Sequence, residues 1–348
     1  MKAHVLYGIN DLRLKTVPDP LPDENEVIVE VKAVGICGSD IPRIYKTGAH
    51  IHPLIPGHEF SGMVTKLGRN VDPKWKGKRV GVFPLISCGT CTQCQKKQYE
   101  MCRDYNYLGS RKNGAFAELV AVPVDNLIVL PENVTFEEAA MFEPMAVSVH
   151  AMRRIQPKLH ETIAVCGLGT IGLLLLMFLK EAGIEHILVI GNKDFQKDLV
   201  LQMGFSEKRY CDCREKNVDQ WLMDQTNGQG PDIFFECVGK NETYIQAVNN
   251  TAPAGRIMLM GNPYSDMILE KSVYWKILRN QLTVMGTWNS SFTHDTRDDW
   301  HYVLKRLEQK RIAPAELVSH RFLHNELEQG FAIMRDKTED YIKIMGIM

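Results

Sequence analysis

Apolar residues along the chain follow two patterns, and the change falls near residue 150. In the first part, apolar runs are short, often alternate with polar residues, and are separated by glycine and proline. Examples are residues 27–32, 60–65 and 79–83. Short alternating runs bounded by such turn residues are typical of strands. We therefore predict a compact β-rich domain for this part of the chain.

From about residue 160, short apolar runs alternate with helical segments. The predicted strands are residues 163–166, 187–190, 233–238, 257–260 and 282–285. Such alternation predicts a parallel sheet with helices on both faces. After about residue 290 the chain becomes polar and helical over 298–311, and it ends in a strand-like run over 341–348. The whole chain is thus predicted to be an α/β protein.

Composition excludes some partners and locations. The chain has 348 residues and a formal net charge of -1, so we expect no general attraction to nucleic acid or to anionic lipid. The most apolar stretch, 171–179, is too short to span a bilayer, and the N-terminus lacks the pattern of a signal peptide. Nine cysteines, an odd number, fit a reducing compartment. We expect a cytoplasmic protein without a membrane partner.

A glycine-rich motif follows the first predicted parallel strand. It reads Gly167-Leu168-Gly169-Thr170-Ile171-Gly172 and is followed by a helical segment, 173–182. The three glycines would allow a tight turn, a close approach of the backbone to a pyrophosphate, and close helix–sheet packing. The helix N-terminus would then face the phosphates. This context predicts a dinucleotide site; a glycine-rich turn without a ligand is the alternative.

The end of the next strand bears on the choice of coenzyme. An acid that binds the adenosine ribose is expected there, but the sequence is Gly191-Asn192-Lys193. A small glycine, an amide and a lysine favour a 2′-phosphate, so NADP(H) is predicted over NAD(H). Asp194 is the alternative acid, three residues late. The predicted coenzyme contacts also include Val238 and Gly239, at the end of a later strand.

Four cysteines in one segment, residues 88–102, form a candidate metal site. Cys88, Cys91, Cys94 and Cys102 have the spacing C-x2-C-x2-C-x7-C. Four thiolates close a tetrahedral zinc shell and leave no open position for chemistry. We predict a structural zinc site; free thiols or a disulfide pair are the alternative.

A second set of possible ligands is scattered along the chain: Cys37, His58, Glu59 and Glu143. A catalytic zinc takes three protein ligands and keeps one position open. A carboxylate-rich site would also suit manganese or iron. Each residue alone is a weak signal, and spacing does not bring them together.

The motifs occur together in an order that resembles the zinc-dependent medium-chain dehydrogenases. They are Cys37-Gly-Ser-Asp, Gly57-His-Glu, the cysteine segment and the glycine motif. Residues 39–50, 57–62 and 107–114 resemble the polyol and sugar-phosphate branch, the galactitol-1-phosphate 5-dehydrogenases. The resemblance implies a GroES-like catalytic domain (1–150 and 290–348) and an inserted Rossmann domain (151–289) with strand order 3-2-1-4-5-6. It also implies a homodimer or homotetramer.

The resemblance also implies roles for individual residues. Cys37, His58 and Glu143 would hold a catalytic zinc, with Glu59 as a near or exchangeable ligand. Asp40 would orient His58 from behind, and Ser39 would bind the substrate hydroxyl and take its proton. Pro42 stands where many relatives have a relay histidine, so the proton would leave through His50, Glu59 or water.

Basic residues near the implied site predict a phosphorylated substrate. Arg43 and Arg111 are the candidate phosphate ligands, with Lys46, His50 and Lys112 nearby in sequence. Solvated surface charges are the alternative. Trp288 would wall the substrate pocket or be a packed indole.

The implied reaction is oxidation of a polyol phosphate, galactitol 1-phosphate at C5 to tagatose 6-phosphate. Alternatives are sorbitol-like, arabitol-phosphate or threonine dehydrogenase activity, or a nucleotide-binding protein without turnover.

Overall fold

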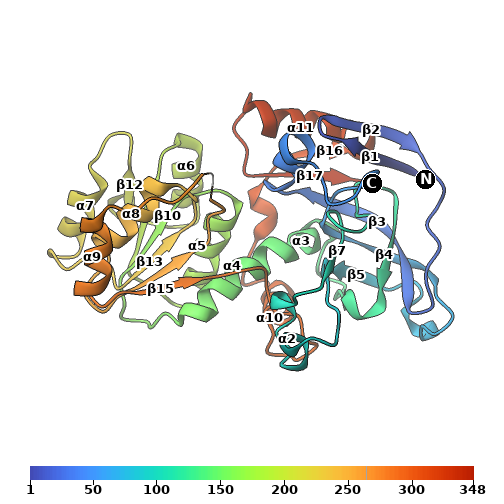
Figure 1. The fold of residues 1–348 in the computed structure, drawn as a ribbon, viewed down its shortest axis with the longest axis horizontal. Helices are drawn as coiled ribbons and strands as arrows, with labels where there is room; N and C mark the ends of the chain where they lie inside the picture. The colour runs from blue at the N-terminus through green and yellow to red at the C-terminus, as the bar shows by residue number, and fades with distance from the viewer. Residues whose placement is uncertain (264) are drawn as a thin grey trace. The chain divides into compact units, whose positions relative to one another are not determined.

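The chain forms two compact units in a computed structural model that describes residues 1–263 and 265–348 (Figure 1). The first unit comprises Met1–Ala146 and Ser290–Met348, and the second comprises Val147–Asn289. The chain passes from the first to the second within helix α4 (Phe142–Ile155). The first unit is therefore discontinuous in sequence.

A seven-stranded sheet organises the first unit. Its order is β16-β17-β3-β4-β5-β9, and β8 also pairs with β3. The strands are β3 (Glu26–Ile36), β4 (Glu59–Leu67), β5 (Arg79–Val82), β8 (Leu119–Pro123), β9 (Leu127–Val129), β16 (Val318–Leu323) and β17 (Lys343–Ile347). All pairs are antiparallel except β16 with β17. Valine and isoleucine side chains of β3 and its neighbours form the core of this unit.

Smaller elements surround this sheet. They are the hairpin β1 (Lys2–Gly8) and β2 (Asp11–Thr16), the pair β6 (Leu85–Ile86) and β7 (Asn106–Tyr107), and the helices α1 (Asp40–Pro42), α2 (Thr92–Gln95), α3 (Phe136–Ala140), α10 (Asp299–Glu308) and α11 (Leu327–Asp336). A capping box between Thr135 and Glu138 begins α3. The unit is β-rich, as the sequence pattern predicts.

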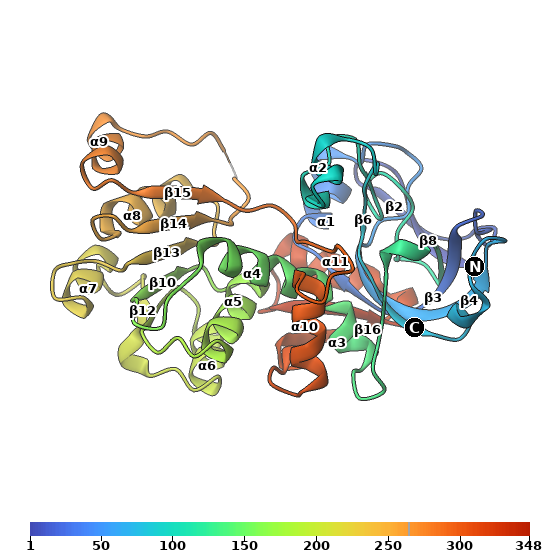
Figure 2. The same cartoon turned by 90° about the horizontal axis from the view of Figure 1, so that it is seen from below.

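The second unit is built on a six-stranded parallel sheet with helices on both faces (Figure 2). Its strands are β10 (Ile163–Cys166), β11 (Ile187–Gly191), β12 (Tyr210–Asp212), β13 (Ile233–Glu236), β14 (Arg256–Leu259) and β15 (Thr283–Gly286). Its helices after α4 are α5 (Thr170–Glu181), α6 (Asp194–Gln202), α7 (Val218–Gln225), α8 (Asn241–Asn250) and α9 (Lys271–Arg279). The order β12-β11-β10-β13-β14-β15 is the predicted order 3-2-1-4-5-6. The predicted fold class is confirmed.

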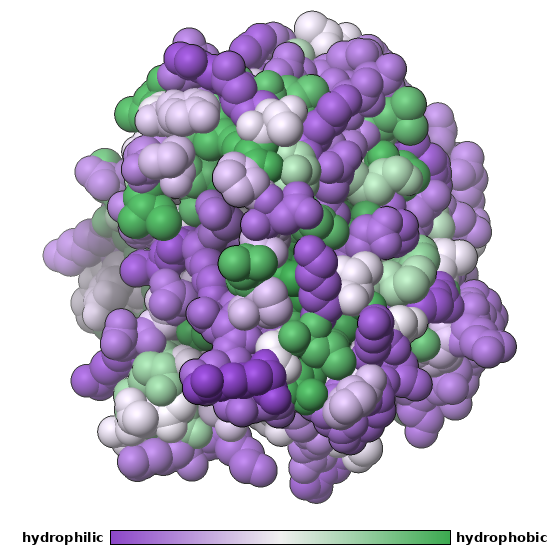
Figure 3. Space-filling view, turned by 90° about the vertical axis from the view of Figure 1, so that its right-hand side faces the viewer, coloured by the Kyte–Doolittle hydropathy of each residue, from purple (hydrophilic) through white to green (hydrophobic). Residues whose placement is uncertain are grey.

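The surface shown in Figure 3 is mostly hydrophilic, and hydrophobic residues form small separate patches on it. Small patches of this kind are normal for the surface of a folded protein and need no partner. Within the described residues, no helix has the length and apolar character that crossing a membrane requires.

Candidate active site and coenzyme site

The register of two strands brings the first two predicted metal ligands together. Strand β3 ends at Ile36, directly before Cys37, and β4 begins at Glu59, directly after His58. Gly35 pairs with Glu59 across the antiparallel ladder, so the chain leaves β3 where it enters β4. A side chain on Gly35 would overlap the Glu59 carboxylate, which explains the glycine. The sheet therefore joins ligands that are far apart in sequence.

The ligand atoms of Cys37, His58 and Glu59 all lie within 4.8 Å of one another. His58 and Glu59 are buried. Glu143, at the start of α4, is buried as well but lies outside this group of three. Its Oε1 accepts a hydrogen bond from the Tyr107 hydroxyl at 3.3 Å. The Tyr107 ring packs edge-on against the His58 ring, with 5.7 Å between the ring centroids. One half-buried thiol, one buried imidazole and two buried carboxyl groups thus lie in one region.

Asp40, which the resemblance assigns to orient His58, lies next to that imidazole. Its Oδ1 is 3.5 Å from Nδ1 of His58, and its Oδ2 accepts a hydrogen bond from the Cys37 amide at 3.0 Å. The Arg43 guanidinium donates to the same carboxylate at 2.5 Å. Burial alone would raise the pKa of Asp40, but His58 and Arg43 hold it below its ordinary value. Asp40 therefore connects a predicted ligand to a predicted phosphate contact.

Lys343 is a member of this cluster that the sequence analysis did not identify. Ile344 of β17 pairs with Ile36 of β3, so Lys343 lies beside Cys37. Its buried ammonium group donates to Glu59 and, at 3.2 Å, to the carbonyl of Ile36. Burial works against the charge, yet Glu59 and Cys37 raise the pKa of Lys343 above its ordinary value. The sequence feature that could have identified Lys343 is a single lysine inside an apolar C-terminal strand.

Acidic groups crowd this region. Burial raises the pKa of Glu143 to about 7, and the nearby Glu59 adds to the shift. The pKa of His58 is well above its ordinary value, because Asp40 and Cys37 outweigh the effect of burial. A divalent cation would relieve this repulsion, and a thiolate, an imidazole and a carboxylate are ligands that zinc takes in catalytic sites. The residues present fit such an ion.

The remaining predicted catalytic residues lie near this cluster or at the surface. The hydroxyl of Ser39 is 3.3 Å from Sγ of Cys37. His50 is exposed. Burial, and then the positive charges of Arg111 and Arg43, lower the pKa of His50. Three predicted basic residues of one unit are therefore close enough to interact electrostatically.

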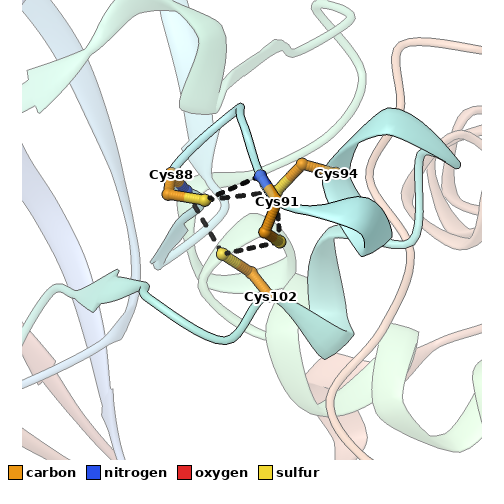
Figure 4. Close-up of side chains that lie close together, drawn as sticks. All are labelled: Cys88, Cys91, Cys94 and Cys102. Atoms are coloured by element: carbon orange, nitrogen blue, oxygen red, sulfur yellow. Dashed lines mark hydrogen bonds between the residues drawn. The ribbon is translucent and has the colours of Figure 1, made fainter.

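The four cysteines of residues 88–102 form a compact cluster, and their sulfur atoms point toward one another (Figure 4). The Sγ–Sγ distances are 3.9 Å for Cys88–Cys94, 3.6 Å for Cys91–Cys94 and 3.9 Å for Cys91–Cys102. A zinc tetrahedron with bonds of about 2.3 Å has edges of about 3.8 Å, so the cluster fits the ion. All nine cysteines of the chain are free. Hydrogen bonds, first from Thr90, lower the pKa of Cys88 to about 6, which favours a thiolate ligand.

The glycine motif forms the turn between β10 and α5. Gly167 has a φ of 99°, which favours glycine, and Gly172 packs so tightly that a side chain would overlap the Gly167 carbonyl. Gly169 caps α5, and a Cβ there would meet no atom within 4 Å. The helix begins at Thr170, three residues earlier than predicted, so its first N–H groups lie at the motif itself. Open space at a helix N-terminus fits a pyrophosphate.

The surroundings of Gly191 differ from the prediction. A Cβ on Gly191 would lie 2.5 Å from the Tyr210 hydroxyl and 2.6 Å from Cδ1 of Leu168. The expected room for a 2′-phosphate beside Gly191 is therefore filled by these side chains. Asn192 and Lys193 are exposed, and Asp194 is bound by Arg214, which also holds Asp212. The local motif gives no sign of Tyr210 and Arg214, because they belong to the next strand and its end.

Other predicted contacts lie in the second unit. Val238 and Gly239 follow β13, and Val238 lies against the glycine turn, since a Cβ on Gly167 would be 2.6 Å from its Cγ2. Trp288 is 59% exposed, so it is not a packed indole of this unit.

Known proteins match both parts of the chain. Residues 23–132 match the family profile described as alcohol dehydrogenase GroES-like domain, and residues 170–309 match zinc-binding dehydrogenase. The chain is 31% identical over 314 residues to galactitol 1-phosphate 5-dehydrogenase of Escherichia coli K12, covering 90% of each protein. The chain belongs to the zinc-dependent medium-chain dehydrogenases. Sorbitol dehydrogenase of Bacillus subtilis is 29% identical over 84% of each chain.

Solved structures of this family have the same fold. The crystal structure of galactitol-1-phosphate dehydrogenase from Escherichia coli superposes with a TM-score of 0.93 at 29% identity, covering 100% of both chains. Two dehydrogenases at 25% identity and a TM-score of 0.90 cover 100% of this chain and 99% of their own: one from Sinorhizobium meliloti bound to NADP, one from Escherichia coli CFT073 complexed with NADH. Among these two similar proteins, one thus binds NADP and the other NADH.

Proposed function

We propose that this dehydrogenase oxidises a polyol phosphate, with galactitol 1-phosphate oxidised at C5 to tagatose 6-phosphate as the specific reaction. The observation that carries the phosphate is that His50 lies close enough to Arg111 and Arg43 for their positive charges to lower its pKa further, after the larger effect of burial. Arg43 also contacts Asp40 behind the predicted ligand His58. A phosphate bound by these cations would lie near the reacting carbon. The similarity to galactitol 1-phosphate 5-dehydrogenase supports the same substrate.

The proposed site uses the residues of the first unit in distinct roles. Cys37, His58 and Glu143 would hold a catalytic zinc, which would supply the Lewis acidity that lowers the pKa of the substrate hydroxyl. Ser39, 3.3 Å from the Cys37 sulfur, accepts that proton first. Glu59 stays near, tied to Lys343. Cys88, Cys91, Cys94 and Cys102 hold a second zinc for structure. A coenzyme bound by the second unit would supply the hydride acceptor.

The side chain of Pro42 cannot carry a proton, so the second step of the proton path needs another group. His50 is exposed and its pKa is lowered, so at neutral pH it is a neutral base that can take a proton to solvent. We assign the outer step of the relay to His50 or to water.

NADP(H) is the proposed coenzyme. Asn192 and Lys193 stand exposed after β11, and the nearest acid, Asp194, is held by Arg214. Without a free carboxylate, the site lacks the usual acceptor for the ribose hydroxyls of NAD. Because Gly191 is packed against Tyr210, a phosphate would be bound by the side chains that follow it and not beside Gly191.

The edge strand β15 and helix α9 support a homodimer, as a symmetric pair or within a tetramer. Strand β15 is the last of its sheet, so its outer edge can pair with the same strand of a second copy. Tyr274, Trp275 and Leu278 of α9 are each about half exposed. Light scattering of the purified protein measures the assembly, and a monomer would contradict it.

The substrate is tested by the rate of reduced-coenzyme formation at 340 nm with galactitol 1-phosphate and with galactitol, each with NADP and NAD. The proposal expects turnover confined to the phosphate, faster with NADP. Turnover of free polyols alone would move the substrate to the sorbitol branch. The same four rates also give the coenzyme preference, which is tested independently of the substrate.

A further inference from the structure

Glu236 is a buried carboxylate at the carboxyl end of the parallel sheet. It is 2% exposed and is the last residue of β13. Strand β13 borders β10 on the side opposite to β11. The strand order reverses there, and a dinucleotide crosses the sheet at this point with its adenosine half on the β11 side. The nicotinamide half therefore belongs on the side of β13.

Three donors converge on one oxygen of Glu236. Its Oε1 accepts hydrogen bonds from the amides of Val238 at 2.8 Å and Gly239 at 2.9 Å, and from the Thr243 hydroxyl at 2.8 Å. Its Oε2 accepts none from the described residues. Within residues 1–263 and 265–348, Glu236 forms no ion pair with a lysine or arginine. A carboxylate oxygen that accepts from three donors is held in one position.

The loop that Glu236 holds lies against the glycine turn. A Cβ on Gly167 would be 2.6 Å from Val238, and a Cβ on Gly239, whose φ is 82°, would overlap the carbonyl of Asn262. The backbone of residues 237–239 is thus fixed between the turn after β10 and the segment after β14. Glu236 anchors this backbone by accepting from two of its amides.

The neighbouring thiols respond to a negative charge at this position. Burial raises the pKa of Cys237 well above its ordinary value, and the Glu236 carboxylate raises it further. The same two causes, in the same order, raise the pKa of Cys166 at the end of β10. The Glu236 carboxylate is therefore close enough to raise the pKa of thiols at the carboxyl ends of both β10 and β13.

We propose that Glu236 is a positioning residue for the coenzyme loop and that its fixed negative charge favours the oxidised coenzyme over the reduced one. The oxidised nicotinamide ring is positively charged and the reduced ring is neutral, so only the oxidised form gains from a nearby carboxylate. In a partly buried site, one such interaction changes affinity on the order of tenfold. This inference rests on dinucleotide binding by the second unit and not on the identity of the polyol.

The test is the dissociation constant of the full-length, zinc-loaded protein for NADP, NADPH, NAD and NADH, measured by calorimetry without substrate. Glu236→Gln keeps an acceptor for the loop amides and removes the charge. We expect about tenfold weaker binding of the oxidised forms and unchanged binding of the reduced forms. Glu236→Ala removes the anchor as well and should weaken both.

Asp232→Asn is the matched control, because Asp232 lies directly before β13, at its opposite end, and accepts from the Thr162 amide at 2.8 Å. This variant should change neither the ratio of the dissociation constants for NADP and NADPH nor the ratio for NAD and NADH. Equal losses for both redox forms in Glu236→Gln would overturn the charge role, and unchanged binding in both variants would overturn the proposal entirely. A wild-type preference for NAD would refute only the proposed coenzyme, since the oxidised-to-reduced ratio is measured within each pair.

Discussion

Lys343 donates from its buried ammonium group to the carboxylate of Glu59, 284 positions earlier in the chain. The last strand of the protein thereby supplies the positive charge for a cluster of acids that the first strands assemble. Two buried charges of opposite sign are stable together and costly apart. This pair therefore couples the end of the chain to the predicted catalytic site.

Replacing Lys343 by methionine should destabilise the protein by about 3–5 kcal/mol, because Glu59 is left as an uncompensated buried charge. Urea unfolding of zinc-loaded and chelator-treated protein measures the loss. We expect the larger loss without zinc, since the cation would otherwise balance Glu59. Lys197→Met breaks the exposed pair with Glu207 and should change stability little, because water screens an exposed ion pair. A similarly small loss for Lys343→Met would show that the buried pair carries no stability.

Replacing Cys94 by serine should remove one zinc per chain and lower thermal stability. Cys94 is buried and its sulfur lies 3.6 Å from that of Cys91, so serine leaves a three-sulfur site. Elemental analysis of the purified variant counts the metal. Cys213→Ser is the control, because Cys213 is exposed and lies outside the cluster. An unchanged zinc content in Cys94→Ser would refute the structural site.

Arg111→Ala should raise KM for the phosphorylated substrate by about ten- to a hundredfold, the loss typical of a charged hydrogen-bond partner. The KM for a neutral polyol should not change. Arg111 is the cleaner choice, because Arg43 also holds Asp40 and its loss would disturb His58. Lys66→Ala in β4 is a control at an exposed cation of the same unit. Equal effects on both substrates would place Arg111 outside the phosphate site.

Asn192→Asp should shift coenzyme preference toward NAD by about tenfold or more, because a carboxylate would repel a 2′-phosphate and accept from ribose hydroxyls. The ratio of kcat/KM for the two coenzymes measures the shift. Gly191→Asp is a poor test of the same idea, since its side chain would clash with Tyr210 and Leu168. An unchanged ratio in Asn192→Asp would mean that the ribose is bound elsewhere.

Stability should fall as the pH is lowered from about 6.5 to about 4, through His4. This side chain is fully buried, and burial lowers its pKa to about 4. In the unfolded chain the same imidazole binds a proton near pH 6.5, so acid favours unfolding by up to about 3 kcal/mol. The free energy of unfolding against pH, for wild type and His4→Phe, tests this. The slope should be shallower in the variant, and an equal slope would exclude His4 as its source.

Local patterns in the sequence were sufficient for some parts of the structure. Strand β10 has the predicted bounds, and the four cysteines meet because they share one short segment. Strand β12 was missed, since its three residues, Tyr210–Asp212, are too few to show a period. Tyr210, 19 positions after Gly191, also fills the room that the sequence appeared to leave for a phosphate.

The candidate catalytic site depended on information that spacing does not contain. Cys37 and His58 meet through the register of β3 with β4, and Lys343 joins them through β17. Only the resemblance to a known family indicated that Cys37, His58 and Glu143 belong together, and their role as ligands stays a prediction. Lys343 could have been suspected, because a charged residue in an apolar strand needs a partner.

The pairing of Gly35 with Glu59 also has a consequence for how this enzyme can change. Both ends of the segment 37–58 are fixed to neighbouring strands, so the 20 or so residues between them form a closed loop on a rigid base. That loop carries Ser39, Arg43 and His50, while the anchors carry the thiol and the imidazole. Exchange of loop residues other than Asp40 and Arg43 between relatives would therefore alter what is recognised without disturbing His58, and grafting that part of the loop is a direct route to new substrates.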